Sequence, residues 1–204
     1  MNLRPFLAMV AMSAALVSCG QLPVSYTKHG NTSNYLAGIG VTSSTSSSLN
    51  PAEADSFWDG DTVSGVPAIH INRAEQKAYF YRDGEVVGVS PISTGNSKHT
   101  TPAGTFKVSE KDPDHASSAY GRIVDMSTGA TIIADADSRK DKPAAGQQFI
   151  GSPMPHFLRF NHGIGMHAGH LPGYAASHGC VRMPKHMAKK FFEHAEVGTV
   201  FTVE

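Results

Sequence analysis

Residues 163–184, GIGMHAGHLPGYAASHGCVRMP, constrain this chain most because they place a cysteine among histidines and glycines. The thiolate is the reactive form of cysteine, and a nearby imidazole can accept the thiol proton. Gly179 precedes Cys180, and a glycine there lets the backbone turn so that consecutive N–H groups point at a developing oxyanion. The segment therefore predicts nucleophilic acyl transfer by Cys180, with the upstream His167 as its base.

Residues 1–18 have the pattern of an export signal, with a basic Arg4, an apolar run over residues 6–17 and small residues at its end. The run is too short to span a bilayer. Residues 16–19, LVSC, resemble the bacterial lipobox, in which the cysteine becomes the lipidated first residue of the mature protein. We therefore expect residues 1–18 to be a lipoprotein signal peptide and Cys19 to carry the lipid.

This expectation places the protein in the periplasm, attached to a membrane by its N-terminal lipid. Gln21, after the lipidated cysteine, is not the aspartate that retains enteric lipoproteins at the inner membrane, and by this resemblance the outer membrane is favoured. Signal cleavage near residues 13–15 is the alternative, and it would leave a soluble periplasmic enzyme. A Cys19–Cys180 disulfide is disfavoured, because exported proteins that rely on disulfides usually carry more cysteines.

Residues 19–61 are rich in Ser, Thr, Gly and Asn and poor in apolar side chains. Such a segment cannot bury enough surface to offset the entropy of ordering, so we expect a flexible tether before a single domain over residues 66–204. The chain has 17 Lys and Arg against 17 Asp and Glu. This balance gives no positive charge excess that would indicate nucleic-acid binding. The oligomeric state stays open.

The pattern of the domain is mostly that of β-strands. A single helix is predicted to begin at Pro184, with Met187, Phe191 and Ala195 as its apolar stripe. Asp83 and Gly84 predict a hairpin turn. Strands are expected over residues 68–72, 77–82, 85–93, 105–109, 122–126, 131–134, 156–160 and 199–203. The fold class predicted from this pattern is β-rich α+β.

The ordered motif resembles that of the L,D-transpeptidase catalytic domain family, which has the YkuD-type fold. In that family a His precedes, by a variable spacer, Ser/Thr-His-Gly-Cys, a hydrophobic residue and Asn or Arg. The matching positions here are His167, Ser177, His178, Gly179, Cys180, Val181 and Arg182. Residues 89–95 with 101–104, and residues 154–160, resemble the family's upstream passages. The likeness covers about residues 66–204 and implies a β-sandwich-type domain with one or two helices.

The resemblance also implies a mechanism on peptidoglycan stem peptides. Cys180 would attack the donor peptide carbonyl and release D-alanine, and an amine acceptor would resolve the thioester. His167 would move the protons, while the main-chain carbonyl of Ala168 would orient its ring. The N–H groups of Gly179 and Cys180 would form the oxyanion hole. No metal or organic cofactor is implied.

Four further residues of the motif region are expected to shape the site or bind substrate. Arg182 offers a rigid two-pronged donor for a carboxylate. His178 is either a part of the site or a core histidine with its hydrogen bonds satisfied. Ser177 is equally consistent with a turn hydroxyl, and Tyr174 either covers the donor pocket or serves packing.

Three alternatives to amine transfer are consistent with parts of the sequence. Water as acceptor would make the same residues an amidase or carboxypeptidase. A cell-wall binder without activity is disfavoured by the intact His and Cys. A metal-binding module is the more distant alternative, because zinc ligands occur close together at His162, His167, His170, His178 and Cys180. The glycine-rich spacing does not match a standard zinc motif.

Overall fold

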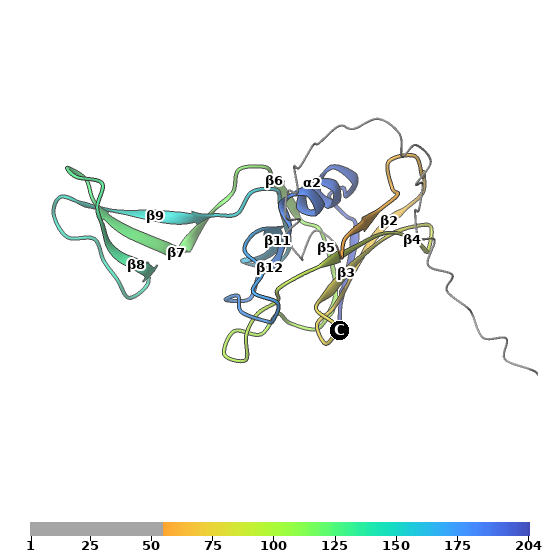
Figure 1. Cartoon of the computed structure of the whole chain (residues 1–204), viewed down its shortest axis with the longest axis horizontal. Coiled ribbons are helices and arrows are strands. Elements are labelled where there is room, and N and C mark those ends of the chain that lie inside the picture. The colour runs from red at the N-terminus through yellow and green to blue at the C-terminus, as the bar shows by residue number, and fades with distance from the viewer. Residues whose placement is uncertain (1–54) are drawn as a thin grey trace, which may run out of the picture. The chain divides into compact units, whose positions relative to one another are not determined.

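The computed structural model describes residues 55–204 (Figure 1). The predicted signal peptide, the lipidation site Cys19 and most of the predicted tether lie outside the described residues. Within residues 55–204, no helix combines the length and the apolar character needed to cross a membrane. The part described below belongs to one compact unit, Ser46–Glu204.

A six-stranded sheet forms one side of the domain. Its order is β1 (Phe57–Trp58), β4 (Glu85–Pro91), β3 (Lys77–Arg82), β2 (Pro67–Asn72), β13 (Val200–Val203) and β5 (Gly104–Lys107). The β3–β4 hairpin turns at Asp83 and Gly84, whose φ angles of 47° and 88° fit the predicted tight turn. The last strand, β13, pairs parallel with β2 and antiparallel with β5, so the C-terminal strand lies inside the sheet.

A four-stranded sheet and one helix complete the core. The sheet order is β12 (Val181–Met183), β11 (Ile164–Ala168), β10 (Phe157–Asn161) and β6 (Glu110–Asp112), and the helix is α2 (Lys185–His194). The helix follows Pro184 directly and packs against β10 and β11. It buries Met187, Ala188 and Phe191 in the same hydrophobic cluster as Ile69 of β2. Its apolar stripe therefore joins the two sheets.

A separate three-stranded sheet lies between β6 and β10 in the sequence. Its order is β8 (Thr131–Asp137), β7 (Ala116–Asp125) and β9 (Gln147–Pro153), and we call it the inserted sheet (Figure 1). Its strands pair antiparallel, with β7 in the centre. Ile123, Val124 and Ala136 are buried, but Met126 and Ile132 are more than half exposed. The inserted sheet thus buries little apolar surface of its own.

The predicted β-rich α+β class is confirmed, with α2 as the single helix of residues 55–204. One boundary was wrong. Phe57 and Trp58, assigned to the tether, form β1 on the edge of β4, and the Trp58 ring lies 5.3 Å from that of Phe80. Asp61 forms an ion pair with Lys190 of α2, with 2.7 Å between Oδ2 and Nζ. The folded part therefore begins before the predicted start at residue 66, because one aromatic anchor was overlooked in a polar segment.

Candidate active site

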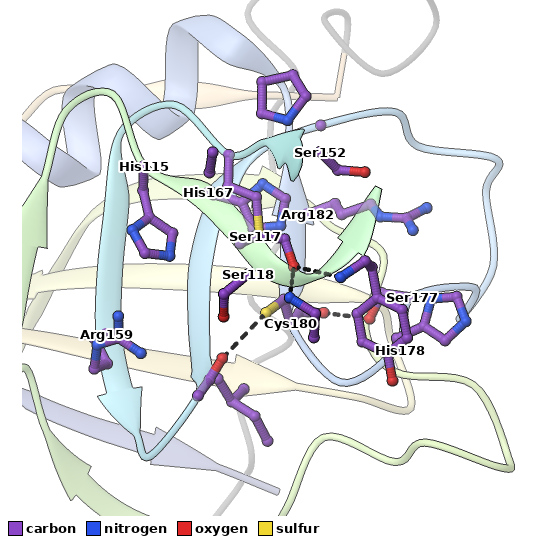
Figure 2. A pocket seen from close by; sticks show the side chains of 18 of the residues that line it. His115, Ser117, Ser118, Ser152, Arg159, His167, Ser177, His178, Cys180 and Arg182 are labelled. Carbon is purple, nitrogen blue, oxygen red and sulfur yellow. Dashed lines mark hydrogen bonds between the residues drawn. The ribbon is translucent and has the colours of Figure 1, made fainter. Parts of the chain in front are cut away.

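The loop that ends in Cys180 opens into a cavity of about 550 Å³. β12 follows this loop directly and pairs parallel with β11, with His167 opposite Arg182. Cys180 lies two positions before Arg182, so this register brings the cysteine and the histidine, which are separated in sequence, close together across two adjacent strands. Figure 2 shows His167, Cys180 and Arg182 together in the cavity, and all three line it.

The imidazole of His167 is buried and held in one orientation. Its Nδ1 lies 2.9 Å from the carbonyl oxygen of Ala168, the contact that the family resemblance implies. Because a carbonyl only accepts hydrogen bonds, Nδ1 carries the proton in the neutral ring and Nε2 is left as an acceptor. Burial lowers the pKa of His167 to about 4, and the charge of Arg182 acts in the same direction. The ring is therefore neutral at pH 7.

The thiol of Cys180 is also shifted towards its neutral form. Burial raises its pKa, while a main-chain hydrogen bond from Gly165 and the positive charges of Arg159 and Arg182 oppose the shift. Its Sγ lies 3.9 Å from the carbonyl oxygen of Gly163, a distance at which a thiol can donate weakly. The site thus favours a neutral thiol beside a neutral imidazole over a resting thiolate–imidazolium pair.

Two chain segments lock together behind the nucleophile; we call residues 93–101 and 177–182 the nucleophile framework. Ser93 and Arg182 exchange two main-chain hydrogen bonds of 2.8 and 2.9 Å. The buried hydroxyl of Thr101 accepts from the N–H of Gly95 and donates to the carbonyl of Gly179, at 2.8 and 2.7 Å. The upstream passage in the family resemblance therefore has a structural basis, because it supports the loop that carries the cysteine.

Gly95 has no room for a side chain in this framework. A Cβ atom at this position would lie 2.0 Å from the carbonyl oxygen of His99 and 3.0 Å from the Cα of Gly179. Gly179 itself has a φ of 119°, a conformation that L side chains rarely adopt. Both glycines are thus required by the close approach and by the turn before Cys180.

The N–H of Gly179 does not take the role expected of it. It donates to the hydroxyl oxygen of Ser177 at 3.0 Å, and that hydroxyl donates to the carbonyl oxygen of Cys180. Ser177 is fully buried and closes a tight turn around the nucleophile. The N–H predicted for the oxyanion hole is therefore engaged inside the loop, and Ser177 serves the turn.

His178 is exposed, so the interpretation as a satisfied core histidine was wrong. Its ring stacks on Tyr120 of β7 at 4.3 Å between centroids, and both residues line the cavity. Arg139 donates to the Tyr120 hydroxyl at 2.7 Å, which fixes the outer side of this stack. A contact between the nucleophile framework and the inserted sheet therefore forms one wall of the cavity.

Arg182 and Tyr174 differ in how they relate to the cavity. The side chain of Arg182 is half-buried, lines the cavity, and makes no hydrogen bond or ion pair within residues 55–204. Its guanidinium is therefore available to an anionic ligand. Tyr174 is 64% exposed and does not line the cavity. Only its carbonyl oxygen contributes, by accepting from the Ser93 hydroxyl at 2.7 Å.

The five residues of the metal-binding alternative do not gather around one point. His162 and His170 are exposed, His178 stacks on Tyr120, and His167 is held by Ala168. In residues 55–204, Glu110, Asp112 and His115 are the group whose ligand atoms lie close enough to share an ion. All three side chains already have a partner, since Arg159 contacts Glu110 at 2.7 Å and His115 contacts Asp112 at 3.0 Å.

Three cavity residues before, within and after the inserted sheet were not predicted from the sequence. His115, Tyr120 and Arg159 line the cavity, although none of them belongs to the motif. The spacing of Asp112 and His115 was the one local signal, because a carboxylate three positions before an imidazole is suited to orient it. Tyr120 and Arg159 gave no such signal, because they reach the cavity through the packing of two different strands, β7 and β10.

A model of the L,D-transpeptidase catalytic domain, YkuD, matches residues 67–203. The chain therefore belongs to this family, as the motif predicted. Among curated proteins, none matches the sequence.

Solved structures with the same fold include several L,D-transpeptidases. An L,D-transpeptidase from Mycobacterium smegmatis is 21% identical with a TM-score of 0.51, and the match covers 68% of this chain and 58% of the M. smegmatis chain. One from Xylanimonas cellulosilytica is 22% identical with a TM-score of 0.51, and the match covers 70% of this chain and 62% of the X. cellulosilytica chain. An L,D-transpeptidase solved in complex with imipenem is 18% identical with a TM-score of 0.52, and the match covers 68% of this chain and 59% of that structure's chain. The chain thus spans less than two thirds of each of these structures, and the likeness shows the fold.

Proposed function

We propose that this protein is an exported, lipid-anchored L,D-transpeptidase that acts on peptidoglycan stem peptides through a Cys180 acyl-enzyme. The observation that carries the proposal is the neutral His167, whose Nδ1 is tied to Ala168 and which shares a cavity with a half-buried thiol. A neutral base with a free Nε2 is what a protonated thiol needs in order to react. The family match over residues 67–203 supports the reaction class.

The proposed reaction has two halves. As Sγ attacks the donor carbonyl, the thiol proton moves to Nε2 of His167 and then to the departing D-alanine nitrogen. The C–N bond breaks and a thioester to Cys180 forms. An acceptor amine then forms a new C–N bond, the C–S bond breaks, and one amine proton returns through His167 to the sulfur. The guanidinium of Arg182 would bind a donor carboxylate.

The oxyanion donors differ from the initial expectation in this proposal. The N–H of Gly179 is engaged by Ser177, so the N–H of Cys180 is the remaining expected donor at the nucleophile. A single main-chain donor can stabilise a tetrahedral intermediate substantially, because its position is preorganised before charge develops.

Mass spectrometry of purified protein with a tetrapeptide donor and isolated sacculi tests the proposal. New cross-links or attached amines, with release of D-alanine, support transfer. Trimmed peptides without any new amide bond would show that water is the acceptor and that the protein is an amidase or carboxypeptidase. A solved relative is in complex with imipenem, so imipenem should form one adduct, on Cys180, and Cys180→Ser should form none.

The anchor is proposed from residues 16–19 alone and has its own test. The mature protein should partition into detergent and carry extra mass on Cys19, and Cys19→Ala should lose both properties. A mature N-terminus elsewhere in an unmodified, soluble protein would contradict the anchor without affecting the proposed chemistry.

A further inference from the structure

A second imidazole faces the cavity opposite the catalytic motif. His115 lies in the connection between β6 and β7 and lines the same cavity as Cys180 and His167 (Figure 2). Its Nδ1 lies 3.0 Å from Oδ2 of Asp112, at the end of β6. The side chain of His115 is 19% exposed, which leaves its ring accessible from the cavity but mostly packed. The motif assigns it no role.

Asp112 sets the tautomer of this ring. Hydrogen bonds from the main-chain N–H of Asp114 and from His115 lower the pKa of Asp112, so its carboxyl is ionised at neutral pH. An ionised carboxylate only accepts hydrogen bonds, so Nδ1 of His115 carries the proton. Nε2 is then the basic atom, and it makes no hydrogen bond within residues 55–204. A base held by an orienting carboxylate is the arrangement used for general base catalysis.

Phe157 holds the two imidazoles in a fixed relation. The His115 ring stacks on the Phe157 ring with centroids 4.2 Å apart, and the Phe157 ring lies 6.3 Å from that of His167. The two imidazoles are held by different partners, His115 by the carboxylate of Asp112 and His167 by the carbonyl of Ala168.

The charged and titratable groups around His115 come from three strands. Asp112 and Glu110 lie on β6, Arg159 on β10 and His167 on β11. Arg159 donates to Glu110 at 2.7 Å and to the carbonyl of His162 at 2.8 Å, so Glu110 largely balances its charge. Asp112 is the charged group in direct contact with the His115 ring.

We propose that His115 is the base on the acceptor side, which deprotonates an incoming alkylammonium group before it attacks the thioester. This inference rests on the proposed transpeptidase function. Primary amines are mostly protonated at neutral pH and cannot attack in that form. Nε2 of His115 takes one proton from R–NH₃⁺, and solvent later removes that proton. The neutral nitrogen then forms the C–N bond as the C–S bond breaks, and its second proton passes through His167 to the sulfur.

The assignment separates two proton-transfer tasks that one histidine would otherwise perform in sequence. His167 activates the thiol in the first half of the reaction, and His115 activates the acceptor in the second. It also favours an amine over water as the acceptor, because Asp112 keeps Nε2 of His115 as a proton acceptor beside the cavity that holds the thioester.

The test separates the two half-reactions in the full-length protein. D-Alanine release from a tetrapeptide donor reports acylation, and amide formation with a lysine-type primary amine reports transfer. His115→Gln should leave acylation within about twofold and lower the maximal transfer rate by about 10²-fold, the lower end for a positioned base. The amine concentration for half-maximal rate should change little, because a proton is affected and not a binding contact.

Two further variants give the controls. Asp112→Asn should lower transfer less than His115→Gln, also without loss of acylation, and it covers the case in which His115→Gln unfolds the domain. His70→Gln removes another imidazole held by a carboxylate, Glu204 at 3.1 Å, but on β2 and outside the cavity, so both half-reactions should be unchanged.

The outcomes distinguish the inference from the proposed function. Equal losses of acylation and transfer in both variants, or full transfer in both, would overturn the role of His115 while leaving Cys180 chemistry intact. Absence of D-alanine release from the parent protein would instead overturn the proposed function itself.

Discussion

The nucleophile framework and the inserted sheet face the same cavity but are built in opposite ways. The framework buries polar side chains completely, including Ser93, Thr101 and Ser177, and satisfies them with hydrogen bonds. The inserted sheet leaves apolar side chains such as Ile132 and Met126 more than half exposed. Buried polar networks that are fully satisfied specify one geometry, and breaking them is costly. The nucleophile Cys180 therefore lies in the region whose geometry the buried hydrogen bonds specify.

The contrast separates the parts that perform chemistry from the parts that define the cavity. The framework positions Cys180 and β11 positions His167, so changes there should affect the first half-reaction. The inserted sheet contributes Tyr120 as one wall, and the connection that leads into it contributes His115. We expect changes in the inserted sheet to alter which acceptor is used more than whether the thiol reacts. Matched substitutions, one at the site or in the core and one elsewhere, test this difference.

The largest effect is expected from His167. His167→Ala removes the base beside the thiol and should lower acylation by about 10² to 10⁴-fold, the usual contribution of a positioned acid–base group. His178→Ala, which removes an exposed imidazole from the wall shared with Tyr120, should lower it far less. The measurement is the rate of D-alanine release. Comparable losses in both variants would contradict the separation of chemistry from cavity wall.

A similar comparison applies to apolar packing. Ile69 is 1% exposed in the core, and Ile69→Ala should lower the free energy of unfolding by about 2 to 5 kcal/mol. Ile132 is 52% exposed on β8, and Ile132→Ala should change it by no more than about 0.5 kcal/mol. Urea unfolding of the two variants and the parent protein measures both changes in the free energy of unfolding. A large loss for Ile132→Ala would show that the inserted sheet is covered by something beyond the described residues.

The buried imidazole should also make stability depend on pH. Its pKa is lowered to about 4, whereas an unfolded histidine titrates near about 6.5. The neutral ring therefore contributes stability that is fully present above about pH 6.5 and is lost as the pH falls to about 4, a change of about 3 kcal/mol. His167→Gln should lack this component, and His70→Gln should keep it. Unfolding curves at several pH values for the three proteins provide the measurement.

The smallest effect is expected from a single hydroxyl. Thr101→Val leaves the Gly95 N–H and the Gly179 carbonyl without their partner, and should cost about 1 to 3 kcal/mol together with part of the acylation rate. Thr131→Val makes the same change on the exposed β8 and should have almost no effect on either quantity. If the two variants behave alike in unfolding and in acylation, the framework does not support the nucleophile in the way described.

Most of the strands could be predicted from the sequence because their patterns are local. The β2–β3–β4 meander alternates apolar and polar residues and turns at Asp83 and Gly84, and α2 has a clear stripe after Pro184. β11 and β12 were missed although they carry or adjoin the catalytic residues. β11 begins among glycines and β12 has three residues, so neither shows a strand period on its own. Their pairing across the sequence defines them.

The site residues that belong to the motif could be predicted from the sequence. The residues and roles that depend on tertiary contacts could not. Cys180, His167 and the Ala168 carbonyl could be named from the resemblance, and the structure brings them together. The engagement of the Gly179 N–H by Ser177 follows from a turn conformation that residue types do not reveal. The prediction that Tyr174 covers the donor pocket was wrong, because its loop leaves the ring exposed to solvent.

Intact-protein mass spectrometry during reaction with a tetrapeptide donor tests the central claim most directly. We predict a single acyl adduct on Cys180, with the mass of the donor less its terminal D-alanine, that forms slowly in His167→Ala and not at all in Cys180→Ser. An adduct of the same mass on the Cys180→Ser protein, or turnover by His167→Ala at the parent rate, would contradict the account.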